Sequence, residues 1–140
     1  MASRNLSDLA PATQLKAEAF IEACNAVGLD VLIYCTLRTS AEQDELYKIG
    51  RTLPGKIVTN ARGGQSLHNT GRAFDFVPLI HGKPQWSDSA LYARCGIIGE
   101  GLGLEWAGRW AGRLRETAHM QYTGGMSTTP PKKNDNDKMR

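Results

Sequence analysis

The chain has 140 residues, of which 41% are hydrophobic and 22% are charged, and its formal net charge is +3. This composition is typical of a globular protein with one core and excludes an intrinsically disordered chain. The arginines are scattered instead of gathered in one stripe, so we expect no nucleic-acid partner. No apolar run approaches the roughly 18 residues of a membrane span, so we expect no membrane insertion.

The first half of the sequence predicts two helices and a strand. A helix is expected with Pro11 near its first turn, because apolar residues recur at helical spacing from Leu15 to Val27, and Gly28 ends it. The apolar run at 31–35 predicts a strand buried on both faces. A second helix is expected to begin at Ser40, with Gln43 as its capping-box partner, and to end at Gly50. Glycines and prolines between residues 53 and 65 predict a loop.

The second half predicts short strands around a third helix. We expect a strand at 73–80, a turn at His81-Gly82, a partner strand at 84–86, a helix at 89–101 capped by Ser87 or Asp88, and short strands at 104–106 and 119–122. The fold class is therefore α+β, with a small antiparallel sheet flanked by helices. Residues 1–126 should form a single domain, and the polar residues 127–140 a flexible tail.

The cysteines and the N-terminus both indicate a reducing compartment. Cys24, Cys35 and Cys95 each lie in an apolar stretch and form no C-x-x-C unit, so we interpret them as small buried side chains. The first eleven residues lack the apolar segment of a secretory signal, which leads us to expect folding in the cytoplasm.

The chemistry is concentrated around a carboxylate in the expected strand 73–80. Asp75 lies between Phe74 and Phe76, where a buried charge is unfavourable unless another group compensates it. A metal ion would do so, and His68 lies just upstream. Further along the chain, His119 follows the carboxylate of Glu116 by three residues.

Two imidazoles and one carboxylate match the three protein ligands of a catalytic zinc site, which keeps a fourth position for water. His68, Asp75 and His119 would then be the ligands, and Glu116 a general base near that water. Simpler interpretations remain open, since either histidine could be an ordinary buried side chain and Asp75 could pair with an arginine such as Arg72 or Arg38. His81, in an expected turn, is given no role.

The pattern S-x-H-x-x-G-x-A-x-D at 66–75, followed by E-x-x-H at 116–119, resembles the signature of D-alanyl-D-alanine carboxypeptidase-type zinc metallopeptidases, which have the hedgehog/DD-peptidase fold. More narrowly, the chain resembles the L-alanyl-D-glutamate endopeptidases that serve as phage endolysins. Similar blocks at 37–52, 73–86 and 103–106 extend the resemblance over roughly residues 15–122. The chain departs from the family at Arg109, where relatives often carry an acidic residue.

The resemblance implies roles for individual residues. His68, Asp75 and His119 would be zinc ligands and Glu116 the catalytic base. Arg38 would bind or polarise carbonyl or carboxylate oxygens of the substrate. Two more residues have two possible roles each. Ser66 would either hydrogen-bond the substrate or only cap its loop. Gln43 would either support Arg38 and the substrate site or only cap its helix.

The expected function is that of a zinc-dependent endopeptidase that cleaves the L-alanyl-D-glutamate bond in the stem peptides of bacterial peptidoglycan. We expect a monomeric phage or prophage endolysin that is made in the host cytoplasm and reaches the wall after release through the membrane. Two alternatives remain: a D-Ala-D-Ala carboxypeptidase, and a non-catalytic zinc-stabilised module that only binds the wall.

Overall fold

The computed structural model describes residues 2–59 and 61–124, so the expected tail at 127–140 lies outside the described residues. The helices are α1 (Pro11–Ala26), α2 (Ser40–Lys48) and α3 (Ser89–Gly101). The strands are β1 (Asp30–Cys35), β2 (Ala73–Ile80), β3 (Lys83–Pro84), β4 (Glu105–Trp106) and β5 (His119–Gln121). Short 3-10 helices lie at Leu6–Asp8, Leu67–Thr70, Ala107–Arg109 and Gly112–Leu114.

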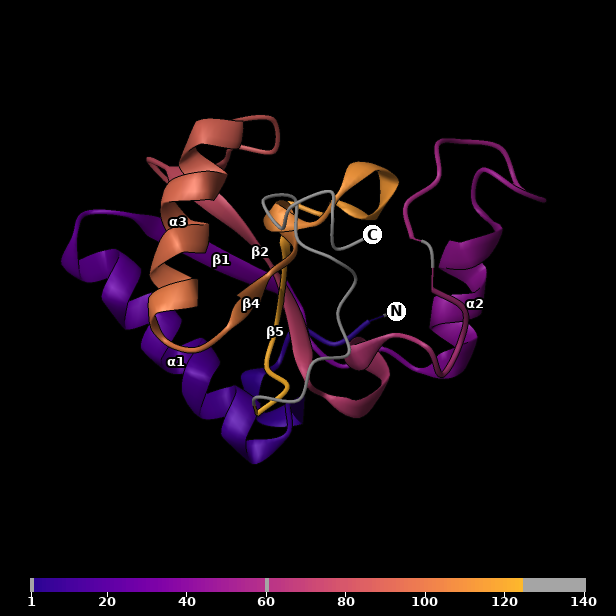
Figure 1. The fold of residues 1–140 in the computed structure, drawn as a ribbon, viewed down its shortest axis with the longest axis horizontal. Coiled ribbons are helices and arrows are strands. Elements are labelled where there is room, and N and C mark those ends of the chain that lie inside the picture. The colour runs from indigo at the N-terminus through magenta and orange to yellow at the C-terminus, as the bar shows by residue number, and fades with distance from the viewer. Residues whose placement is uncertain (1, 60, 125–140) are drawn as a thin grey trace, which may run out of the picture.

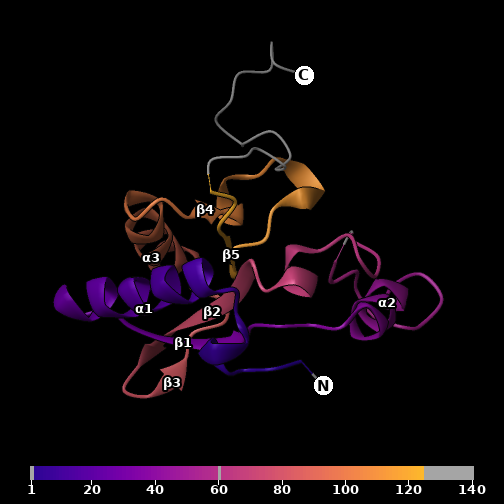
Figure 2. The same cartoon turned by 90° about the horizontal axis from the view of Figure 1, so that it is seen from below.

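The strands form one antiparallel sheet in the order β1-β2-β5-β4, and β3 pairs with the end of β2. Helices α1 and α3 lie side by side against this sheet, whereas α2 stands apart from both (Figures 1 and 2). The expected α+β class with a small antiparallel sheet is therefore confirmed. Within the described residues, no helix combines the length and apolar character needed to cross a bilayer.

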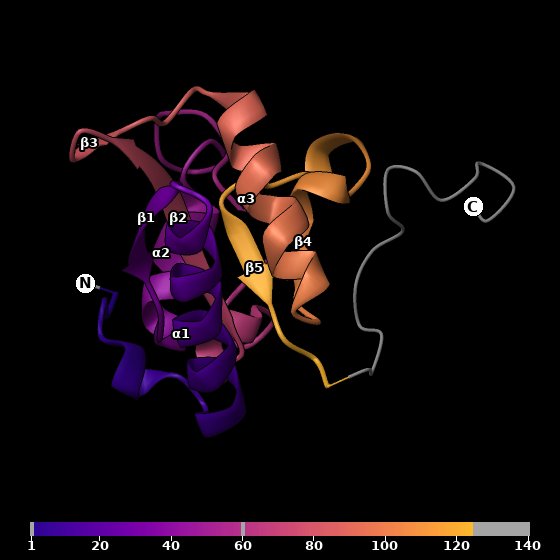
Figure 3. The same cartoon turned by 90° about the vertical axis from the view of Figure 1, so that its left-hand side faces the viewer.

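The two faces of the sheet have different environments. On one face, the ring of Phe20 from α1 lies 5.8 Å from Phe74 and 5.1 Å from Phe76, and Tyr92 from α3 lies 5.4 Å from Phe76. Figure 3 shows the two helices covering this face together. Burial of these rings supplies much of the apolar area that stabilises the fold. Asp75, between the two phenylalanines of β2, therefore points to the opposite face, which we call the site face.

Strand β1 differs from the expectation of burial on both faces. Its residues alternate between buried and more exposed positions, and Leu32 is 38% exposed. The reason is that β1 is an edge strand covered on one face only, by α1. A register shift between Ile33 and Cys35 then places two residues of β1, Tyr34 and Cys35, opposite Asp75. This bulge turns the end of β1 toward the site face.

The ends of the helices are mostly as expected, with one correction. Helix α2 begins as expected at Ser40, but its capping box joins Thr39 to Glu42, so the expected Ser40–Gln43 box is wrong by one residue. The sequence offers two overlapping boxes, and the second fails because Gln43 is buried in other hydrogen bonds. Asp88 caps α3 by accepting a hydrogen bond from the Leu91 amide, 3.0 Å away.

Helix α3 approaches the sheet closely through its glycines. A Cβ at Gly96 would collide with the indole of Trp106, whereas Gly101, in the same helix, has open space around it. We expect Gly96→Ala to destabilise the protein by about 1–3 kcal/mol, because a methyl group there overpacks the core. Gly101→Ala is the matched control and should leave the thermal midpoint unchanged or slightly raised. Equal midpoints for the two variants would contradict this packing.

Candidate metal centre and cleft

His68 is fixed by the 3-10 helix that carries it. The Ser66 hydroxyl accepts a hydrogen bond from the His68 amide at 3.2 Å, and the Arg38 amide donates to the His68 carbonyl at 3.1 Å. Gly71 ends the short helix with φ of 72°, and a Cβ there would collide with the backbone of Ala10. This glycine of the S-x-H-x-x-G pattern is thus required by both its conformation and its close approach to Ala10.

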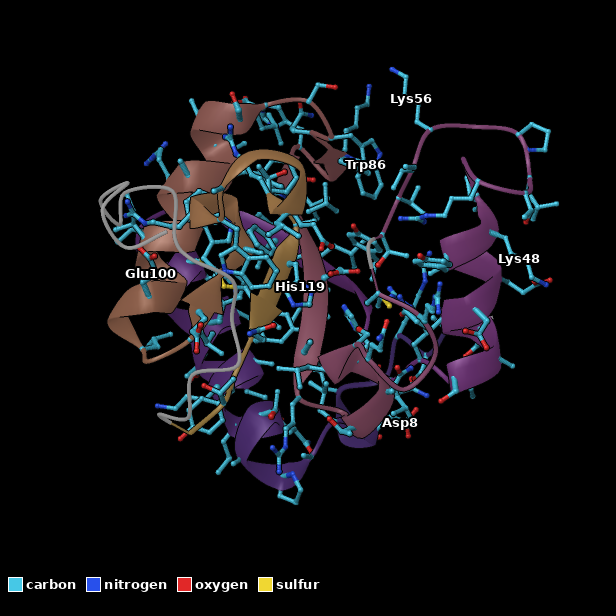
Figure 4. All side chains as sticks on the ribbon, turned by 45° about the vertical axis from the view of Figure 1, so that its right-hand side comes forward. Asp8, Lys48, Lys56, Trp86, Glu100 and His119 are labelled. Carbon is cyan, nitrogen blue, oxygen red and sulfur yellow. The ribbon has the colours of Figure 1, made fainter. Side chains whose placement is uncertain are left out.

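Asp75 and the two histidines converge on the site face. Asp75 in β2 and His119 in β5 are direct cross-strand partners. One carboxylate oxygen of Asp75, Oδ1, lies 3.2 Å from His68 Nε2 and 3.5 Å from His119 Nδ1. The two imidazole rings are 5.0 Å apart, and Figure 4 shows His119 beside β2. The structure thus brings together the three residues that the sequence suggested as ligands.

The outer nitrogens of both histidines have acceptor partners. His68 Nδ1 lies 2.9 Å from the Thr36 carbonyl, and His119 Nε2 lies 2.9 Å from Gln121 Oε1. Because these oxygens accept, each outer nitrogen carries a hydrogen, and the inner nitrogen of each neutral ring presents its lone pair to Asp75. Two lone pairs and a carboxylate oxygen repel one another unless a positive charge lies between them. The arrangement is therefore suited to a cation.

The pKa shifts of the metal-free site also indicate a need for positive charge between these groups. Burial lowers the pKa of His68, but the charge of Asp75 and hydrogen bonds to Asp75 and Cys35 outweigh it and raise that pKa to about 10. Burial raises the pKa of Asp75, but the charge of His68 and hydrogen bonds from His119 and His68 bring it well below its usual range. A proton shared near Asp75 thus supplies the positive charge that a metal ion would otherwise bring.

Cys35 is an alternative to His119 as the third ligand, since one atom each from Cys35, His68 and Asp75 lie within 4.8 Å of one another. Its sulfur, however, lies 3.8 Å from His68 Nδ1, the nitrogen that donates to Thr36, and accepts a hydrogen bond from Arg38 Nη2 at 3.2 Å. The sulfur is therefore behind the imidazole, away from the lone pair. His119 is better placed to complete the set. Like Cys24 and Cys95, Cys35 is free and buried.

Arg38 holds the second oxygen of Asp75. Its Nη2 lies 3.4 Å from Asp75 Oδ2, and its Nη1 donates to Gln43 Oε1 at 2.6 Å. Gln43 is fully buried and donates in turn to Thr59 Oγ1 and the Ala61 carbonyl. Gln43 therefore positions Arg38 and does not reach the surface of the cleft. Among the described residues, Arg38 Nε has no hydrogen-bond partner.

A cleft of about 450 Å³ opens over these groups. It is lined by Arg38, Thr59, Ala61, Gln65, Ser66, Leu67, His68, Trp110, Leu114, Glu116, His119 and Gln121. Ser66 thus both caps its loop and borders the cleft. Burial raises the pKa of Glu116, while the charges of His119, His68 and Arg38 oppose this and that of Asp75 adds to it. A carboxyl with a raised pKa is suited to accept and return a proton.

The loop that carries Glu116 is held from both ends. The Glu116 amide donates to the Ala107 carbonyl at 3.1 Å, and Trp106 Nε1 donates to the Thr117 carbonyl at 2.7 Å. Arg109 makes a two-point ion pair with Glu100 of α3, at 2.8 and 3.0 Å. Arg109 thus ties this loop to α3.

Sequence reasoning missed two residues beside His119. Gln121 accepts from its ring, and the Trp110 ring lies 5.6 Å from it. Strand periodicity offered a signal for Gln121, because residues 119 and 121 of a strand share a face. No comparable signal existed for Trp110, which comes from a separate loop.

The fold and the site define a small α+β protein with a His-Asp-His cation site under a cleft. The family model described as VanY, D-alanyl-D-alanine carboxypeptidase, matches residues 6–103, which include His68 and Asp75. The chain belongs to this VanY family.

Two named relatives are L-alanyl-D-glutamate peptidases. The chain is 38% identical over 130 residues to the peptidoglycan L-alanyl-D-glutamate endopeptidase CwlK of Bacillus subtilis, covering 82% of this chain and 74% of that protein. It is 28% identical over 120 residues to the L-alanyl-D-glutamate peptidase of Listeria phage A118, covering 84% of this chain but only 39% of the phage protein.

Solved structures share the fold. The L-Ala D-Glu endopeptidase ChiX of Serratia marcescens superposes with a TM-score of 0.64 at 23% identity, covering 88% of this chain and 89% of that one. A vancomycin-resistance D,D-pentapeptidase VanY, solved in complex with Zn(II), gives a TM-score of 0.62 at 18% identity, covering 83% and 73%. The family model and CwlK confirm the expected family resemblance, and these structures confirm the expected fold.

We expect Gln121→Leu to weaken zinc binding by about 10–100-fold, because the ring of His119 loses the acceptor that fixes its orientation. The measurement is competition with a fluorescent zinc indicator at fixed pH. Gln14→Leu, on α1 and remote from the cleft, is the control and should bind zinc like the unaltered protein. An unchanged affinity in folded Gln121→Leu would exclude this positioning role.

Proposed function

We propose that this chain is a zinc-dependent endopeptidase that cleaves the L-alanyl-D-glutamate bond in peptidoglycan stem peptides. The observation that carries the proposal is the convergence of His68, Asp75 and His119 on one point of a cleft whose wall contains Glu116. The peptidoglycan endopeptidase with 38% identity supports the choice of substrate and bond.

The three donor atoms suit zinc better than magnesium or calcium. Two imidazole nitrogens and one carboxylate oxygen are a zinc-type set, whereas the harder cations prefer all-oxygen ligands. A zinc ion held by His68, Asp75 and His119 would supply a Lewis acid and lower the pKa of a water molecule at its open position. The related Zn(II)-containing VanY structure is consistent with this choice.

The protein's own groups then have separate tasks. Glu116 accepts the proton of the attacking water on its carboxylate and returns it to the nitrogen of the leaving D-glutamate. Arg38 holds Asp75 through Nη2 and also lines the cleft, where its positive charge stabilises a substrate oxygen. Ser66 lies at the rim of the cleft and binds the peptide backbone there.

The carboxypeptidase activity in the family description is the second candidate. The two reactions use the same site and differ in the product: an endopeptidase exposes the amino group of D-glutamate, whereas a D-Ala-D-Ala carboxypeptidase releases free D-alanine. A non-catalytic wall-binding module is less favoured, because a purely structural zinc site does not need Glu116 beside it.

The biological setting is part of the proposal. The similarity to a Listeria phage peptidase supports a phage or prophage endolysin. The enzyme would be a monomer that accumulates in the host cytoplasm and reaches the wall once the membrane is opened. Host cells that produce it should lyse when a membrane-permeabilising agent is added and stay intact before that addition.

We expect Glu116→Gln to keep its zinc and to lose about 10²–10⁴-fold in peptidoglycan cleavage, since it removes the group that moves the proton. The assay combines turbidity loss of purified walls with mass spectrometry of released fragments. Glu22→Gln, an exposed change on α1, is the matched control.

Chelation should abolish the activity of the unaltered protein, and added zinc should restore it. New D-glutamate amino termini would support the endopeptidase, and free D-alanine would favour the carboxypeptidase. A protein that binds zinc and walls yet releases nothing would show that the catalytic proposal is wrong.

A further inference from the structure

An aromatic pair of one exposed and one partly buried ring lies outside the site described so far. Trp86, which follows β3, is 57% exposed, although tryptophan is usually among the well-buried residues. Its ring packs edge-on against Tyr34, with ring centres 5.1 Å apart and planes at 76°. The other two tryptophans, Trp106 and Trp110, are each only 7% exposed. The contact with Tyr34 therefore holds a large flat side chain at the surface.

The pair is placed on the site face, next to Asp75. Tyr34 belongs to the bulge that lies opposite Asp75, and the Gln85 amide donates to the Pro78 carbonyl at 2.8 Å, which fixes the hairpin before Trp86. Burial, followed by the charge of Asp75, raises the pKa of Tyr34, in agreement with this proximity. Tyr34 is thus the link between the metal centre and Trp86.

The loop before Thr59 also presents exposed apolar side chains. Thr59 lines the cleft, and the two residues before it, Ile57 and Val58, are 49% and 52% exposed. In Figure 4, Trp86 and Lys56 lie at the same end of the molecule, on the side beyond His119. Trp86 and the loop with Ile57 and Val58 therefore present exposed apolar side chains on the same side of the molecule.

The proposed substrate supplies a group that fits an aromatic surface. In a stem peptide, the L-alanine before the cut bond is attached to a sugar of the glycan strand, so a pyranose ring lies within one residue of the reacting carbonyl. The C–H face of a pyranose is apolar and flat and stacks on an indole ring, whereas its hydroxyl groups stay in water. A peptide side chain offers no comparable flat face at that position.

We propose that Trp86, held in place by Tyr34, binds the glycan sugar attached to the stem peptide, and that this contact favours wall-attached peptide over free peptide. The proposal rests on the proposed function, because it takes the cut to lie one residue from the sugar. It assigns Trp86 a part in substrate binding and none in the chemical step.

The test compares kcat/KM on two substrates, a muropeptide with its disaccharide and the same stem peptide without sugar. Trp86→Ala should lose about tenfold on the muropeptide, the size of one aromatic stacking contact, and should be unchanged on the free peptide. Trp86→Tyr should retain most of the activity on both. Ile97→Ala, which removes an apolar side chain of 55% exposure from α3, is the control and should match the unaltered enzyme.

A second measurement does not depend on catalysis. Titration of the peptide-free disaccharide should shift the indole N–H NMR signal of Trp86 and leave those of Trp106 and Trp110 in place. Equal losses on both substrates, or no loss on either, would overturn the proposal, as would an unshifted Trp86 signal. An enzyme that cleaves neither substrate while its Trp86 signal still shifts would refute the proposed function and leave the sugar site standing.

Discussion

The rest of the site depends on the carboxylate of Asp75. One of its oxygens faces both His68 and His119, and the other faces Arg38, so one side chain sets the position of three positively charged or proton-bearing groups. A carboxylate at this depth is stable only with that surrounding charge. The cross-strand pairing with His119 and the 3-10 helix that carries His68 are best understood as the means by which the fold surrounds it.

Alternate side chains of strand β2 face the hydrophobic core and the cleft. Phe74 and Phe76 pack on the helices, and Asp75 between them faces the cleft. Because the side-chain period of a strand is two, a one-residue slip would exchange the faces and bury the carboxylate in the core. The same rigid sheet therefore serves as the base of the core and as the support of the metal ligands. The solved structures of similar fold share this sheet-and-helix architecture.

Local features of the fold were accessible from the sequence, and long-range contacts were not. The bounds of β2 and α3 followed from periodicity and capping residues, and the pattern around His68 and Asp75 suggested a metal site. The exposed face of β1 was missed because a strand of apolar residues does not reveal that it lies at an edge. Gln43 was misassigned because two capping boxes overlap, and only burial distinguishes them. The sequence left open whether Asp75 pairs with Arg72 or Arg38, and the structure shows Arg38, through a pairing that only the three-dimensional fold creates.

The hydrogen bonds of Gln43 couple sequence changes in the cleft loop to the position of Arg38. One amide side chain joins the loop at Thr59 and Ala61, which borders the cleft, to Arg38 and through it to Asp75. A change in loop length or path that adapts the cleft to a new wall chemistry therefore also displaces the guanidinium beside the ligand carboxylate. Selectivity and turnover are not independent traits here. Lineages that alter this loop must retain the amide anchor or replace it, and directed evolution of the loop alone will meet that constraint first.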